Sequence, residues 1–184
     1  MNDQKYEKLM DEIRSRLEKQ SNQINSNMDL TETAKAAQLK ELRQKIEAEA
    51  LALKTQRREE MQQRRDELYP KYMAVRYAPT DTEADKAVKQ NLYQQAVEKA
   101  QAAKDFDELL NMKTLAQRTG NKMLVQACGF VFFEQGYINE AKAALAAGNS
   151  TREKEFDELI DLTFSIESEQ LSSGMVKESF MFAV

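Results

Sequence analysis

The segment YEKLMDEIRSRLEKQSNQINSNMDLTETAKAAQLKELRQKIEAEALAL (residues 6–53) decides the fold of this chain. Its first half carries apolar residues separated by three, four or seven positions, which places them on one stripe of a helix. They are Tyr6, Met10, Ile13, Leu17 and Ile24. We therefore expect a helix over residues 3–26.

A second helix is expected from residue 30 to about residue 69. Turn residues 26–29 precede it, and Asp29 with Glu32 three positions later is typical of a capping box. Its apolar face comprises Leu39, Leu42, Ile46, Ala50 and Leu53. Antiparallel pairing matches the two faces at equal distances from the turn, in the pairs Leu17 with Leu42, Ile13 with Ile46, Met10 with Ala50 and Tyr6 with Leu53. This register predicts an antiparallel coiled-coil hairpin.

Past the hairpin's local pairing, the second helix becomes strongly polar, with the sequence KTQRREEMQQRRDE (residues 54–67). Met61 is the one apolar residue there and is a candidate for contact with another protein. The basic residues that could reach a nucleic-acid backbone are Arg57, Arg58, Arg64 and Arg65. Interleaved carboxylates favour a solvated face of ion pairs instead, so nucleic-acid binding is an alternative interpretation.

Pro70 interrupts the helical pattern, because proline lacks a backbone donor and disfavours helical geometry at the residue before it. We expect a kink or a break at residues 68–70 and a turn at residues 78–81. The predicted organisation is a hairpin stalk over 1–78, a small helical bundle over 79–174 and an apolar tail over 175–184.

The bundle is expected to contain five helices, since glycines and capping residues punctuate its sequence. Their predicted ranges are 82–103, 106–118, 121–135, 138–147 and 151–172, the last capped by Ser150 or Thr151. The apolar residues of these helices suffice for one compact core. Those expected in the core include Leu92, Phe106, Leu109, Leu115, Leu124, Phe133, Ile138, Leu145, Phe156, Leu159, Ile160 and Phe164.

The tail that follows Gly174 carries only Lys177 and Glu178 as charged residues, so it is a candidate partner-binding element. Its candidate contact residues are Phe180, Met181, Phe182 and Val184. Two conformations are open at this point: an extended segment that enters a neighbour's groove or sheet edge, and a short helix that folds back onto the bundle.

Composition limits the chemistry that this chain of 184 residues can perform. It has no histidine, which removes the common general base and the usual zinc ligand. Cys128 has no basic neighbour in sequence, so we interpret it as a buried structural thiol. We interpret the carboxylates of residues 153–161 as a solvated helix face. We expect no catalytic residue, no cofactor and no metal. The absence of a signal-peptide pattern and of a long apolar stretch predicts a cytoplasmic or virion location.

The stretch ACGFVFFEQGYINEAKAAL (residues 127–145) resembles a single tetratricopeptide-type helical hairpin, taken here over residues 122–147. The matching positions are Gly129, Phe132, Gly136, Ala141 and Leu145. In such a hairpin small residues let two antiparallel helices approach, and large apolar residues fill the space beside them. The resemblance implies a hairpin that binds another protein or packs within its own chain.

These observations predict an all-α, non-enzymatic assembly protein that acts through helix-mediated contacts, with itself or with a larger partner. Its general design is similar to that of bacteriophage scaffolding, connector and other virion proteins. The alternatives are an adaptor or inhibitor that binds one host protein, and a helical nucleic-acid-binding protein that uses the segment Arg57–Arg65. The chain has a formal charge of −4 and lacks the concentrated positive charge of a dedicated nucleic-acid binder.

Overall fold

The computed structural model describes the backbone of residues 3–181 and the side chains of residues 4–169. Over that range it contains seven helices and no strand, and 83% of the chain is helical. The prediction of an all-α protein is confirmed. The chain divides into two compact units, residues 1–62 and residues 63–184. This division lies upstream of the expected boundary at residue 78, inside one continuous helix.

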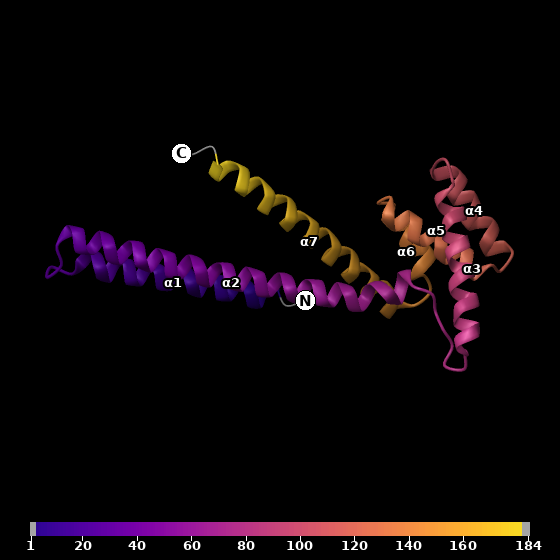
Figure 1. The fold of residues 1–184 in the computed structure, drawn as a ribbon, viewed down its shortest axis with the longest axis horizontal. Coiled ribbons are helices and arrows are strands. Elements are labelled where there is room, and N and C mark those ends of the chain that lie inside the picture. The colour runs from indigo at the N-terminus through magenta and orange to yellow at the C-terminus, as the bar shows by residue number, and fades with distance from the viewer. Residues whose placement is uncertain (1–2, 182–184) are drawn as a thin grey trace. The chain divides into compact units, whose positions relative to one another are not determined.

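The first unit contains helix α1 (Asp3–Ser26) and most of helix α2 (Glu32–Met73), which lie side by side in Figure 1. In this unit the side chains of Tyr6, Ile13 and Ile46 are buried. The other predicted stripe residues are half-buried, namely Met10, Leu17, Ile24, Leu39, Leu42, Ala50 and Leu53. Both apolar stripes are therefore at least partly shielded from solvent.

Ion pairs between described side chains join α1 to α2. Lys5 Nζ lies 3.5 Å from Glu60 Oε1, and Arg16 pairs with Glu49. The step from Lys5 to Arg16 along α1 equals the step from Glu60 back to Glu49 along α2, so the helices run antiparallel in one register. Side chains tilt toward the N-terminus of their helix, so Lys5 and Arg16 reach away from the turn, while Glu49 and Glu60 reach toward it. Each ion pair therefore connects α1 to a residue of α2 that lies farther from the turn than the predicted apolar partner does. The apolar pairs themselves stay a prediction.

The cap of α2 differs from the prediction. The Thr31 hydroxyl accepts a hydrogen bond from the backbone N–H of Ala34 at 3.3 Å, so Thr31 is the N-cap residue. Asp29 instead donates its backbone N–H to Asn27 Oδ1 at 2.9 Å, within the turn. The predicted capping box of Asp29 and Glu32 is therefore wrong, because the turn uses two more residues than expected before the helix begins.

Helix α2 continues through Pro70 and ends at Met73. A break at residues 68–70, one of the two expected alternatives, is therefore wrong. Proline removes one backbone hydrogen bond from the helix. Hydrogen bonding of helical spacing is present again just after it, since the backbone N–H of Ala74 donates to Pro70 O at 3.2 Å. Leu68, Tyr72 and Met73 are buried around Pro70. Their burial offsets the lost hydrogen bond and continues the helix through this position.

The second unit contains the end of α2 and five further helices. These are α3 (Glu83–Gln101), α4 (Phe106–Arg118), α5 (Lys122–Glu134), α6 (Ile138–Leu145) and α7 (Ser150–Met181). Helix α5 packs against α3, α4 and α6, and α6 contacts α7. Each of these helices lies close to its predicted range except α7, so the predicted glycine and capping signals are largely confirmed.

The core of this unit is built from aromatic and aliphatic side chains around α5. Phe132 is fully buried and its ring centroid lies 5.7 Å from that of Phe106. Phe156 lies 5.2 Å from Tyr72 and 6.0 Å from Phe133, again between ring centroids. Three residues expected in the core are instead exposed: Leu92, Leu115 and Phe164 keep 50%, 63% and 53% of their surface.

Helix α7 differs from its prediction at both ends. It begins at Ser150, and Asn149 Oδ1 accepts hydrogen bonds from the backbone N–H groups of Thr151 and Arg152, so Asn149 is the cap in place of Ser150 or Thr151. At the other end the helix continues through Gly174 to Met181. A glycine inside a helix costs only about 1 kcal/mol relative to alanine, which good helix formers on either side can offset.

Candidate protein-interaction surface

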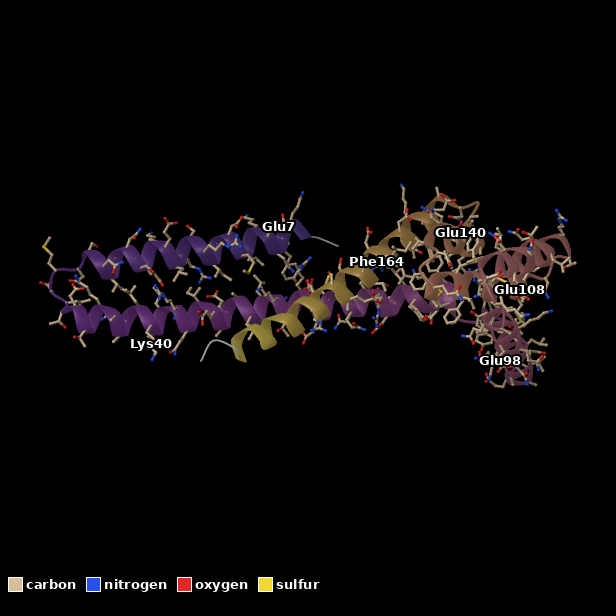
Figure 2. All side chains as sticks on the ribbon, turned by 90° about the horizontal axis from the view of Figure 1, so that it is seen from above. Glu7, Lys40, Glu98, Glu108, Glu140 and Phe164 are labelled. Carbon is tan, nitrogen blue, oxygen red and sulfur yellow. The ribbon has the colours of Figure 1, made fainter. Side chains whose placement is uncertain are left out.

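An apolar groove lies between the end of α2, the α5–α6 turn and α7, and encloses about 590 Å³. Its apolar lining residues are Tyr69, Phe133, Ile138, Ile160 and Phe164. The first four are half-buried, whereas Phe164 leaves 53% of its surface exposed. We call this site the Phe164 groove; Figure 2 labels Phe164 on α7.

The turn between α5 and α6 positions one wall of the Phe164 groove. Gly136, with φ of +80°, lies just past the end of α5 in the left-handed conformation that glycine adopts without strain. The backbone N–H of Tyr137 donates to Phe132 O at 2.8 Å and that of Gly136 to Phe133 O at 3.0 Å, which is a Schellman motif. The chain therefore reverses within a few residues, and Phe133 and Ile138 both reach the groove.

Charges of both signs border the groove. Arg65 Nη2 lies 2.9 Å from Asp66 Oδ1, and Glu134 and Glu167 complete the charged lining. Burial raises the pKa of Tyr69, and the nearby Glu134 raises it further. The Tyr69 hydroxyl therefore stays protonated at neutral pH and can donate a hydrogen bond at the groove.

Arg64 is tied into the fold beside this groove. Its guanidinium forms a two-pronged ion pair with Glu158, with Nε–Oε1 and Nη2–Oε2 both at 2.9 Å, and a further bond to Glu67 at 3.1 Å. Hydrogen bonding to Arg64 lowers the pKa of Glu158 below its usual range. The sequence pattern predicted ion pairs along this helix face but not the Glu158 pair, which joins residues far apart in the chain.

The predicted site residues differ from one another in burial and in their contacts. Met61 is fully buried, so its side chain has no free surface, and its expected contact with another protein finds no support here. Arg57 and Arg58 are half-buried, and Arg65 pairs with Asp66. Phe180 and Met181 lie in α7, so the extended tail conformation does not hold for them. Phe182 and Val184 lie outside the described residues.

Catalytic and metal chemistry find no centre among the described side chains. Burial raises the pKa of the Cys128 thiol to about 11, so this thiol stays protonated at neutral pH. Within residues 4–169, no group of His, Cys, Asp or Glu could hold a metal ion. Three acidic residues of α7 are engaged with separate cations: Glu155 with Lys71, Asp157 with Lys142 and Glu158 with Arg64.

Helices α5 and α6 pack closely against each other at Gly129. A Cβ atom added to Gly129 would lie 2.7 Å from Leu145 Cγ and 2.9 Å from Ala144 Cβ. Phe132, Ala141 and Leu145 are all buried. Gly129 is therefore required for the approach of α6, while the family resemblance itself rests on the sequence pattern alone.

Comparison of the chain with protein-family models, with curated proteins and with solved structures gives no match. None of the helices within the described residues is both long enough and apolar enough to span a membrane.

Sequence reasoning missed the Phe164 groove because it assigned Phe164 to the core. Among the described side chains of α7, those of Phe156, Leu159, Leu162 and Ile166 are buried and form one stripe. Ile160 and Phe164 are four residues apart and form a second stripe on the same helix. A second apolar stripe on a helix already buried along the first was the available signal.

Proposed function

We propose that this chain is a non-enzymatic assembly protein whose first contact is with a second copy of itself through the Phe164 groove. The observation that carries the proposal is the half-exposed Phe164 side chain at a groove lined by other apolar residues. Aromatic residues, phenylalanine included, are enriched at the cores of protein interfaces, and residues that fill a partner's pocket there carry much of the binding energy.

A second copy fits this surface because the surface carries both a projecting side chain and a receptor for it. A twofold interface is self-complementary, so Phe164 of each copy can enter the groove of the other. A one-sided adaptor would need only one of the two features.

Two features of the residues present support a non-enzymatic role. The chain has no histidine, and its single thiol is buried and protonated. The rival nucleic-acid function is not favoured, because Arg64 is held by Glu158 and Arg65 by Asp66. A bacteriophage origin rests on general design alone and adds nothing to the argument for self-association.

Substitution at the exposed apolar positions tests this function. Phe164→Ser should weaken self-association roughly ten- to a hundredfold, because burying a phenylalanine contributes about 1.5–3 kcal/mol. Leu115→Ser is the matched control, since Leu115 is also exposed on a helix and lies outside the groove. Size-exclusion chromatography with light scattering should give smaller particles for Phe164→Ser alone. Dissociation by Leu115→Ser with no effect of Phe164→Ser would refute the proposal.

A further inference from the structure

A second groove in the residue 63–184 unit encloses about 700 Å³ and has a basic lining. Its charged lining residues are Arg76, Lys89, Lys122 and Arg152, and no carboxylate lines it. This composition is unusual for a chain with 31 acidic and 27 basic side chains. We call the site the Arg76 groove.

The cations of the Arg76 groove are only partly neutralised. Lys89 is paired with Asp81, at 2.5 and 2.7 Å from its two carboxylate oxygens. Arg152 donates to the backbone carbonyl of Leu145 and lies 5.4 Å from the centre of the Tyr72 ring. Among the residues that the structure describes, Arg76 and Lys122 have no hydrogen-bonded or ion-paired carboxylate.

Arg76 and Arg152 also act on each other. Burial lowers the pKa of Arg76, and the positive charge of Arg152 lowers it further. Two like charges therefore share this site. An anion bound between them would relieve this repulsion and would gain charge-assisted hydrogen bonds.

Besides Gln117, Gln126 and Tyr93, the remainder of the lining is apolar, and it suits a peptide better than a nucleic acid. Val75 and Met123 are half-buried and Leu145 is buried at the groove. A phosphate backbone requires a longer track of cations than Arg76, Lys122 and Arg152 supply. An acidic peptide with apolar residues between its carboxylates matches both the charge and the apolar floor.

We propose that the Arg76 groove binds an acidic, leucine-containing peptide segment of a partner protein. The carboxylates pair with Arg76, Lys122 and Arg152, and an apolar side chain lies against Val75 and Met123. This site is separate from the Phe164 groove, since the two grooves share no lining residue. The partner would therefore bind the self-associated form as well as the single chain.

Fluorescence anisotropy with a labelled peptide of sequence LEELEE tests this site, with LQQLQQ as the uncharged control. The full chain should bind LEELEE and not LQQLQQ, and binding should weaken as salt is raised. The double variant Arg76→Gln with Lys122→Gln should weaken binding roughly tenfold or more, through lost charge-assisted hydrogen bonds. Arg152 is left intact because its bond to Leu145 supports the fold.

The matched control is Arg43→Gln with Lys104→Gln, which removes the same charges at exposed positions outside the groove. This control should bind LEELEE as the natural chain does. Both double variants should keep the melting temperature of the natural chain. Phe164→Ser should also bind normally, which separates this test from that of self-association. The proposal fails if LEELEE does not bind, if both double variants weaken binding equally, or if a single-stranded oligonucleotide binds where the peptide does not.

Discussion

At the scale of single residues, Gly129 controls how closely α5 and α6 approach. Alanine has the better helix propensity by about 1 kcal/mol, which alone would stabilise α5. The added methyl group would lie under 3 Å from Leu145 and Ala144, and overpacking of this kind costs about 1–3 kcal/mol. Because Ala144 has no flexible side chain to move aside, the clash should outweigh the propensity gain.

We therefore expect Gly129→Ala to lower the free energy of unfolding by about 1 kcal/mol. Urea denaturation measures this change. In a Leu145→Ala background the penalty should shrink, because the two closest contacts come from Leu145. A stabilising effect of Gly129→Ala in the natural background would mean that α5 and α6 are not in close contact at this position.

At the scale of helices, the Arg64–Glu158 pair joins the end of α2 to α7. Its side chains retain 37% and 28% of their surface, so solvent screens the pair, but its two-pronged geometry is favourable. A double-mutant cycle with Arg64→Gln and Glu158→Gln should give a coupling of about 1 kcal/mol at pH 7. The exposed pair Asp11–Arg14, studied with Asp11→Asn and Arg14→Gln, should give a coupling near zero.

The coupling between Arg64 and Glu158 should depend on pH in a defined direction. Arg64 lowers the folded-state pKa of Glu158 below its unfolded value of about 4.3. The pair therefore stabilises the fold fully above that unfolded value, and its contribution is lost as pH falls through the lower folded value. A coupling that stays constant from pH 7 down to pH 3 would contradict the assigned ion pair.

The continuation of α7 through Gly174 is a second prediction at this scale. Alanine inside a helix is favoured over glycine by about 0.5–1 kcal/mol, so Gly174→Ala should raise helical ellipticity and should not lower stability. A glycine that ended the helix would adopt positive φ, and alanine there would be destabilising. The sign of the change in circular dichroism therefore decides between the helix to Met181 and the helix end expected from sequence.

The sequence predicted these elements best where one stripe of apolar residues faces one partner. Helices α1 and α2 follow from the spacing of Tyr6 to Leu53, because each has a single buried face. Caps were predicted less well, since Asp29 and Thr31 are equally suitable residues two positions apart. The Phe164 groove was missed because composition does not distinguish the core stripe of α7 from an exposed one.

At the scale of the whole molecule, the central claim is that the chain associates with itself through the Phe164 groove. Neither the helical composition nor the hairpin register predicts this contact, because it depends on which apolar residues the packed bundle leaves exposed. Leu92 and Leu115 are exposed as well, but neither lines the groove. A groove with a projecting aromatic residue is what distinguishes Phe164 from them.

Sedimentation equilibrium of the natural chain over a wide concentration range tests this claim most directly. Self-association through this groove predicts a mass that rises from 21.2 kDa at low concentration toward twice that value, and a Phe164→Ser variant that stays near 21.2 kDa over the same range. A natural chain with the mass of one copy at every concentration, or a Phe164→Ser variant that associates as the natural chain does, would contradict it.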